Sequence, residues 1–130
     1  MKRLNTVALT VSLISVAAPS VFAGDLVIHL DGIAPISRQA VQYQCDAAAQ
    51  SLGLPKGLFR VEYINGGGNS LAVLPISGRA LIFANVGSGS GARYVAQQYV
   101  WWEEAGRSVS LRRESLEGKM ETTCQRVNPK

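Results

Sequence analysis

The feature that most constrains the fold is a series of short segments, from Gln39 onward, in which strand-forming residues gather. Residues 41–46 and 59–63 each place an apolar residue at every second position. Successive side chains of a β-strand point to opposite faces, so this alternation predicts strands with one buried face. Further segments of the same character are residues 71–76, 80–86, 99–102, 109–113 and 119–124.

Turn-forming residues separate these segments. The Asn65–Asn69 stretch (NGGGN) suits a hairpin loop with positive φ angles, and Ser77-Gly78 suits a tight turn. Strands that recur roughly every 10 to 15 residues, without helical periodicity between them, are typical of an antiparallel barrel or sandwich. We predict an all-β fold, a small closed antiparallel barrel. For residues 46–56 the sequence allows two predictions, a short helix or a long hairpin loop.

The first 23 residues have the pattern of a secretory signal peptide. Lys2 and Arg3 form a charged start, residues 7–18 are mostly apolar, and Val21 and Ala23 have the spacing that signal peptidase recognises. The apolar run is shorter than the roughly 20 residues of a membrane-spanning helix. A short anchor helix is the alternative. We expect cleavage after Ala23 and a soluble periplasmic protein with no stable membrane insertion.

The remaining chain is expected to form one domain with an N-terminal extension. The predicted division is a signal peptide at residues 1–23, an arm at residues 24–38 and the barrel domain at residues 39–130. Two outcomes are open for the arm: it packs on the barrel, or it pairs with a second copy of the chain in a homodimer.

The chain has two cysteines, Cys45 and Cys124. In an exported protein an even cysteine count indicates a disulfide, and two cysteines permit one pairing. The bridge would close a loop of about 80 residues, for which the chain-entropy model gives about 4–5 kcal/mol as an upper figure. Two cysteines and His29 cannot supply four zinc ligands, so we expect neither a metal nor a cofactor.

Charge and residue types argue against two classes of function. The formal net charge of +4 falls to +2 without Lys2 and Arg3, and Arg112-Arg113 is the remaining basic pair, whereas nucleic-acid binding requires a concentrated basic face. A single histidine provides no serine–histidine–acid set. We therefore expect no nucleic-acid partner and no enzymatic activity.

The most distinctive segment is the glycine-rich stretch at residues 87–94 (GSGSGARY). Six successive residues, 87–92, lack a large side chain, and glycines lose much backbone entropy on ordering. One interpretation is a flexible connection between strands. The other is a thin loop that enters a partner's cleft and presents hydroxyl and backbone N–H groups. Phosphate binding is disfavoured, because the segment lacks the Gly-Lys-Ser/Thr ending and the dinucleotide fingerprint.

Several of these segments together resemble the bacterial inhibitors of chicken-type (c-type) lysozyme, whose periplasmic and membrane-bound members share one small barrel domain. The resemblance covers roughly residues 39–126. It rests on VQYQCD at 41–46, SGSGARY at 88–94, YVWW at 99–102 followed by Gly106, VSL at 109–111, and Cys124. The lack of a lipoprotein cysteine at the cleavage point resembles the periplasmic branch.

The resemblance implies inhibition by insertion of a loop into the lysozyme cleft. The loop would comprise Ser88, Gly89, Ser90, Gly91, Ala92, Arg93 and Tyr94, and Ser90 matches the serine that lies beside the two catalytic carboxyls. A hydroxyl can donate to an ionised carboxylate and accept from a protonated one. Tyr94 is expected to support the base of the loop rather than contact the partner.

The chain departs from the family fourteen residues after that serine, where Glu104 stands in place of a lysine that pairs with the acidic cleft. A carboxylate there would repel the catalytic acids. Either the turn at residues 102–106 is rebuilt, for example with one extra residue, or Arg93 or Arg107 supplies the cation, since a guanidinium can hold a carboxylate through two bonds. Alternatively, Glu103 and Glu104 contact the basic outer surface of the lysozyme.

Trp101 and Trp102 are neighbours on a predicted strand, so their rings should point to opposite faces, one of them into the core. The secondary contact candidates are Trp102, Glu103, Glu104 and Arg107.

The expected function is periplasmic inhibition of c-type lysozyme, which would protect peptidoglycan in an encounter with a host. The rival hypothesis is a non-inhibitory, adhesin-like envelope module on the same barrel. Glu104 and the charge of +2 favour this rival, because the partner of a strongly basic lysozyme is usually acidic.

Overall fold

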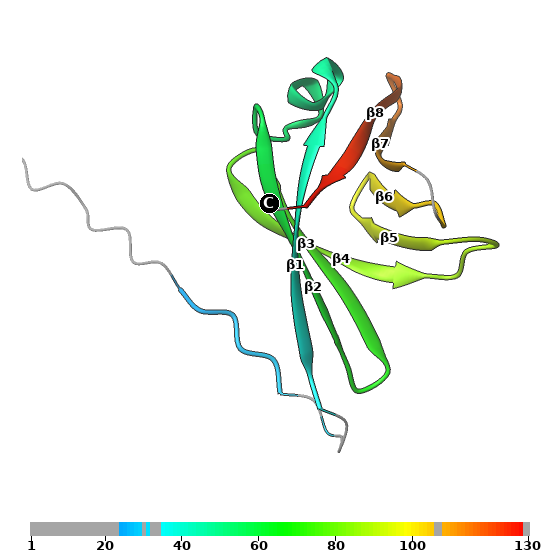
Figure 1. The fold of residues 1–130 in the computed structure, drawn as a ribbon. Helices are drawn as coiled ribbons and strands as arrows, with labels where there is room; N and C mark the ends of the chain where they lie inside the picture. The colour runs from blue at the N-terminus through cyan, green and yellow to red at the C-terminus, as the bar shows by residue number, and fades with distance from the viewer. Residues whose placement is uncertain (1–23, 30, 32–34, 106–107, 129–130) are drawn as a thin grey trace, which may run out of the picture.

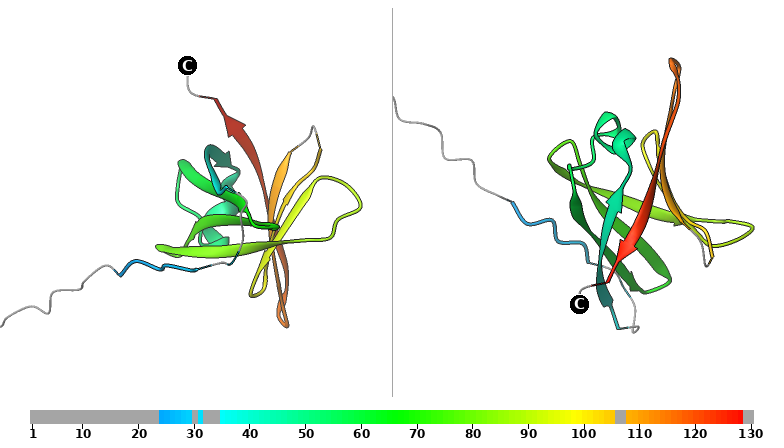
Figure 2. Two further views of the ribbon diagram at one scale, coloured as in Figure 1. Left: turned by 90° about the horizontal axis from the view of Figure 1, so that it is seen from below. Right: turned by 45° about the horizontal axis from the view of Figure 1, so that its top comes forward.

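The computed structural model describes residues 24–29, 31, 35–105 and 108–128. The predicted signal peptide and Arg107 lie outside the described residues. In both views of Figure 2, residues 24–29 of the expected arm run outside the barrel without forming a strand. Their apolar side chains Leu26 and Val27 are 72% exposed.

Eight antiparallel strands among the described residues form a closed barrel, which confirms the predicted fold class (Figure 1). Each strand pairs with its neighbour in sequence, and the last strand pairs with the first. The strands are β1 (Ser37–Cys45), β2 (Leu58–Gly66), β3 (Asn69–Ile76), β4 (Arg79–Val86), β5 (Ala92–Ala96), β6 (Tyr99–Glu103), β7 (Val109–Ser115) and β8 (Gly118–Val127).

Seven of these strands correspond to the predicted segments, with Asp46 lying just beyond the end of β1, and β5 is the one that the sequence pattern missed. The last three residues of the predicted inhibitory loop, Ala92, Arg93 and Tyr94, begin this strand. The connecting loop is therefore shorter than expected and comprises residues 87–91.

The barrel interior is filled by the inward-facing side chains of alternate strand positions. Trp101 is fully buried and meets Tyr43 edge to face, with 5.1 Å between ring centroids and 88° between ring planes. Edge-to-face contact suits the aromatic quadrupoles and adds to the free energy gained from burial. Trp102, the next residue, is half-buried on the outer face, which confirms the expected opposite orientation of the two indoles.

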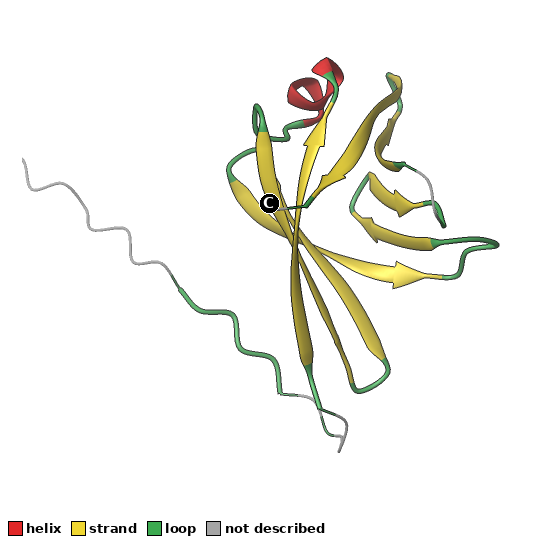
Figure 3. Ribbon diagram, viewed as in Figure 1, coloured by secondary structure: helices red, strands yellow, loops and turns green. Residues whose placement is uncertain are grey.

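A short 3-10 helix, η1 (Ala47–Leu52), decides the open question between β1 and β2 (Figure 3). Its Ala49 and Leu52 are buried in the core, and the helix packs against β7 and β8. No helix among the described residues has both the length and the hydropathy needed to cross a membrane.

Asp46 caps η1 and also ties β1 to β8. Its carboxylate accepts hydrogen bonds from the Ala48 N–H at 3.0 Å, the Thr122 hydroxyl and the Thr123 N–H at 3.0 Å. The hydrogen bond from the Thr122 hydroxyl has the largest effect on the pKa of the Asp46 carboxyl and holds it below its usual range. The hydrogen bond from the Thr123 N–H lowers this pKa further. An aspartate with a lowered pKa stabilises the fold above the pKa of the unfolded chain, and this contribution is lost in acid.

The barrel closes between β1 and β8 along a short seam. Residues 42–45 pair with residues 124–127, and Cys45 lies directly opposite Cys124. The two cysteines form the predicted disulfide. The bridge therefore stands at the point where the two ends of the sheet meet.

Removal of the disulfide should weaken the fold substantially. We expect the Cys45→Ser/Cys124→Ser double variant to lose about 2–5 kcal/mol of unfolding free energy, because an open chain gains more entropy on unfolding. Urea unfolding followed by tryptophan fluorescence measures this loss, with the parent under reducing conditions as the matched comparison. An unchanged unfolding midpoint in both would contradict a stabilising role for the bridge.

Candidate functional site

Residues 87–91 project from the barrel between β4 and β5, at the yellow-green edge of Figure 1. All five residues are exposed. The flanking strands hold the loop at its base, where Val86 pairs with Arg93. The turn between β6 and β7 leaves the same end of the barrel, because β6 runs antiparallel to β5. The loop is thus carried by three strands rather than by a single hairpin.

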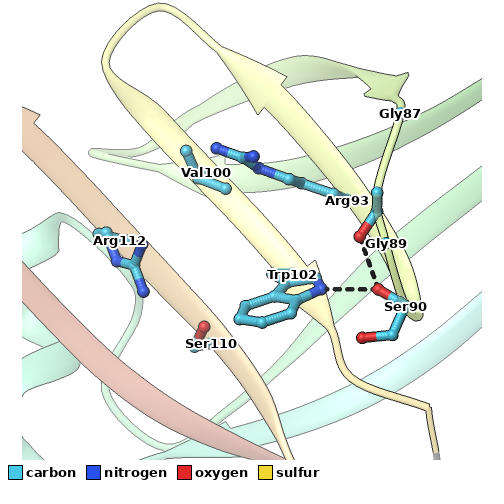
Figure 4. Close-up of a pocket in the computed structure, with 9 residues that line it drawn as sticks. Gly87, Gly89, Ser90, Arg93, Val100, Trp102, Ser110 and Arg112 are labelled. Atoms are coloured by element: carbon cyan, nitrogen blue, oxygen red, sulfur yellow. Dashed lines mark hydrogen bonds between the residues drawn. The ribbon is translucent and has the colours of Figure 1, made fainter.

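Two hydrogen bonds brace the loop at one oxygen atom. The Ser88 hydroxyl donates to the Ser90 carbonyl oxygen at 2.6 Å, and the Trp102 indole N–H donates to the same oxygen at 3.2 Å (Figure 4). The Ser90 hydroxyl makes no hydrogen bond to any of the residues described. The braces fix the main chain at Ser90 and leave its hydroxyl available to another molecule.

Position 91 requires glycine for two reasons, its backbone conformation and the lack of room for a side chain. Its φ of +66° lies in the left-handed region, and a Cβ built on it would lie 1.9 Å from the carbonyl oxygen of Glu103. L-residues disfavour this region, and no heavy atom tolerates so close a contact. Gly91 therefore lets the loop lie directly against the end of β6.

A cavity of about 330 Å³ opens beside the loop on the outer face of the barrel. Figure 4 shows Arg93, Trp102 and Arg112 around it, on the neighbouring strands β5, β6 and β7. Arg112 pairs with Glu121 at 3.3 Å, whereas Arg93 forms no ion pair with the described part of the chain. Arg93 and Ser90 thus line one cavity, and among the described residues no carboxylate neutralises the Arg93 guanidinium. The cavity is lined by Gly87, Ser88, Gly89, Ser90, Arg93, Val100, Trp102, Ser110 and Arg112.

Tyr94 lies inside the barrel, so support of the base of the loop stays a prediction. It is buried, and its ring lies 5.8 Å from the ring of Tyr63 by centroid distance. Burial raises the pKa of the Tyr94 hydroxyl, and the negative charge of Glu103 raises it further by a smaller amount. It therefore remains neutral in the core.

The secondary contact candidates separate in space. Trp102 lies on the outer face beside Ser90, whereas the Glu103 carboxylate points inward and accepts a hydrogen bond from the Tyr43 hydroxyl at 2.8 Å. Glu104 follows β6 in the turn, half-buried, and its N–H donates to the Ser108 carbonyl at 3.3 Å. Contact between lysozyme and Glu104 stays a prediction. The inward carboxylate of Glu103 was missed, because nothing in the local sequence distinguishes it from its neighbour.

The described ranges contain no group of three or more histidine, cysteine, aspartate or glutamate side chains placed to hold a metal ion. What the site offers is a braced hydroxyl, backbone groups, an indole and a guanidinium. Such a set can recognise acidic groups of a partner through hydrogen bonds and charge.

The family is settled by a match over residues 43–119 to the model described as membrane-bound lysozyme-inhibitor of c-type lysozyme. The chain belongs to this family. The matched residues include the whole loop and the whole of β6.

Two curated relatives are similar over about two thirds of this chain. The membrane-bound lysozyme inhibitor of C-type lysozyme of Pseudomonas aeruginosa is 43% identical over 85 residues, which cover 65% of this chain and 60% of the relative. The protein of the same name from Cupriavidus necator is 34% identical over 83 residues, covering 64% and 59%. The chain thus matches about three fifths of the length of these family members.

A solved structure supports the same family. The chain is similar to Pseudomonas aeruginosa MliC, solved in complex with hen egg white lysozyme, with a TM-score of 0.62 and 35% sequence identity. The match covers 81% of this chain and 98% of that one.

Substitution of Gly91 tests the close packing of the loop. We expect Gly91→Ala to lower the unfolding free energy by about 1–2 kcal/mol or more, through the left-handed φ alone and before any clash with Glu103. Gly89→Ala is the matched control, because nothing lies within 4 Å of its added Cβ. Chemical denaturation of both variants gives the difference. Equal stability of the two would show that the contact of Gly91 with Glu103 is unimportant.

Proposed function

We propose that this protein inhibits c-type lysozyme by inserting the loop at residues 87–91 into the active-site cleft. The observation that carries the proposal is the Ser90 hydroxyl, which stands exposed on a main chain fixed by Ser88 and Trp102. The names of the two relatives and the lysozyme-bound state of the solved neighbour support this target.

The chemistry of the target explains why a hydroxyl is suited to the cleft. A retaining glycosidase holds two carboxyl groups about 5–5.5 Å apart, one protonated and one ionised. A serine hydroxyl can accept a hydrogen bond from the first and donate one to the second. A buried hydrogen bond to a charged group contributes about 1.5–3 kcal/mol, and the neighbouring glycines allow the backbone to approach closely.

Arg93 is our candidate for the cation that replaces the family lysine. It lines the same cavity as Ser90 and pairs across the sheet with Trp102, so its guanidinium lies on the partner-facing side. A guanidinium can bind a carboxylate of the cleft through two parallel hydrogen bonds. Arg107, the other candidate, lies outside the described residues.

The setting of this activity is the periplasm. We infer export by the signal peptide at residues 1–23, cleavage before the arm, and an inhibitory role without catalysis. Inhibition in the periplasm would protect peptidoglycan from a host muramidase. The rival envelope module differs in one respect that can be measured, since it would bind without slowing lysozyme.

Substitution of Ser90 is the direct test of the proposal. Ser90→Ala should weaken inhibition at least about tenfold, the equivalent of the smallest hydrogen bond to a charged group, and Ser90→Phe should abolish it by a clash in the cleft. The inhibition constant comes from the turbidity of a bacterial cell suspension with hen lysozyme. Ser51→Ala and Ser51→Phe are the matched controls on an exposed position of η1.

The outcomes separate the two functions. Loss of inhibition in the Ser90 variants, with both Ser51 variants unchanged, supports insertion. A parent protein that does not slow lysis at stoichiometric excess would refute lysozyme inhibition. Co-purification with lysozyme in that case would favour the rival module.

The charge at residue 104 gives a second test. We expect Glu104→Lys to tighten inhibition severalfold at low salt, because it replaces a charge that repels the catalytic carboxyls, and we expect the gain to shrink at high salt. Glu117→Lys makes the same change of charge in the turn between β7 and β8, at the other end of the barrel. Equal effects of the two variants would show that residue 104 does not face the cleft.

A further inference from the structure

The end of strand β6 is anchored inside the barrel by a carboxylate. The Glu103 Oε1 atom accepts hydrogen bonds from the Tyr43 hydroxyl at 2.8 Å and from the Tyr63 hydroxyl. The Tyr63 oxygen in turn accepts the Trp101 indole N–H at 2.9 Å. The carboxylate thus connects β6 to β1 and β2 across the interior.

This anchor is specific because the Glu103 carboxylate is half-buried and its Oε1 atom is directed at two buried hydroxyls. A carboxylate partly removed from water needs donors that replace its lost hydration. Both tyrosines are buried, so their hydroxyls are directed donors with little competition from water. Displacement of Glu103 would remove this shared acceptor and leave the Tyr43 and Tyr63 hydroxyls, which lie 3.0 Å apart, to bond to each other.

The main chain at the same position supports the loop. The Glu103 carbonyl lies against Gly91, and Glu103 pairs with Ala92 in the sheet. The preceding residue, Trp102, holds the Ser90 carbonyl from the outer face. The loop therefore contacts both Glu103, which carries the inner carboxylate, and Trp102, the residue before it.

We infer that Glu103 is a positioning residue for the loop: its carboxylate, held by Tyr43 and Tyr63, fixes the end of β6 on which Ser90 and Gly91 rest. Glu103 then acts through the loop and touches no partner. The consequence for inhibition rests on the proposed function, whereas the ordering of the loop is a property of the free protein.

The ordering is tested by NMR on the free protein. In Glu103→Ala we expect the backbone order parameters of Gly89, Ser90 and Gly91 to fall from about 0.85 to below about 0.6. The Trp102 indole N–H resonance should shift, whereas the backbone amide resonances around Glu117, at the other end of the barrel, should stay in place. General destabilisation would instead move those resonances as well.

Conservative variants separate position from charge. Glu103→Gln keeps an acceptor oxygen for both tyrosines, so it should retain loop order. Glu117→Ala removes a carboxylate far from the loop and should change nothing. Should Glu103→Ala fail to fold, Tyr43→Phe removes one donor while keeping the ring, and Tyr99→Phe, also buried, is its matched control. Loop order should fall in Tyr43→Phe alone.

Inhibition constants complete the test. Glu103→Ala should weaken inhibition at least about tenfold, since a disordered loop loses its preorganisation, and Glu103→Gln should stay within about threefold of the parent. Unchanged loop order in Glu103→Ala, or equal losses in Glu103→Gln and Glu103→Ala, would overturn the inference. A parent that does not inhibit lysozyme refutes the proposed function, while the order parameters still decide the role of Glu103.

Discussion

Closure of the sheet between β1 and β8 is the constraint on which the other parts of the molecule depend. The seam is short, and the Cys45–Cys124 bridge and the hydrogen bonds of Asp46 hold it at one end. Closure places Tyr43, which lies on this seam opposite Arg126, inside the barrel within reach of Glu103 on β6. The Tyr43 hydroxyl therefore joins the seam that the disulfide closes to Glu103, the residue against which Gly91 of the loop packs. A closed barrel also has no free edges, which limits unwanted pairing with other chains.

Strand β6 divides its side chains between the barrel interior and the loop at residues 87–91. Trp101 and Glu103 point inward, where they pack and form hydrogen bonds, and Trp102 between them points outward to the Ser90 carbonyl. The period of two residues is what allows a five-residue strand to serve both purposes. The glycines of the loop give it a thin profile, and β6 provides the contacts that hold it, through the Trp102 indole and the Glu103 carbonyl.

Sequence reasoning identified the barrel, the disulfide and the orientation of the two tryptophans, since each follows from local alternation or from cysteine pairing. It missed β5, because Ala92 to Ala96 continue directly from a glycine run and show little contrast between their faces. It also missed the inward carboxylate of Glu103, whose partners lie 40 and 60 residues earlier in the chain. Contacts of this kind depend on barrel register, which single-sequence patterns do not determine.

The central claim is that a hydroxyl on a braced loop enters the cleft of a lysozyme. A crystal structure of this protein with hen egg white lysozyme tests it most directly. The account predicts the Ser90 hydroxyl within hydrogen-bond distance of both catalytic carboxyls, with Arg93 facing the same cleft and Glu103 still bonded to Tyr43. A complex in which residues 87–91 face solvent and the cleft is empty would contradict it.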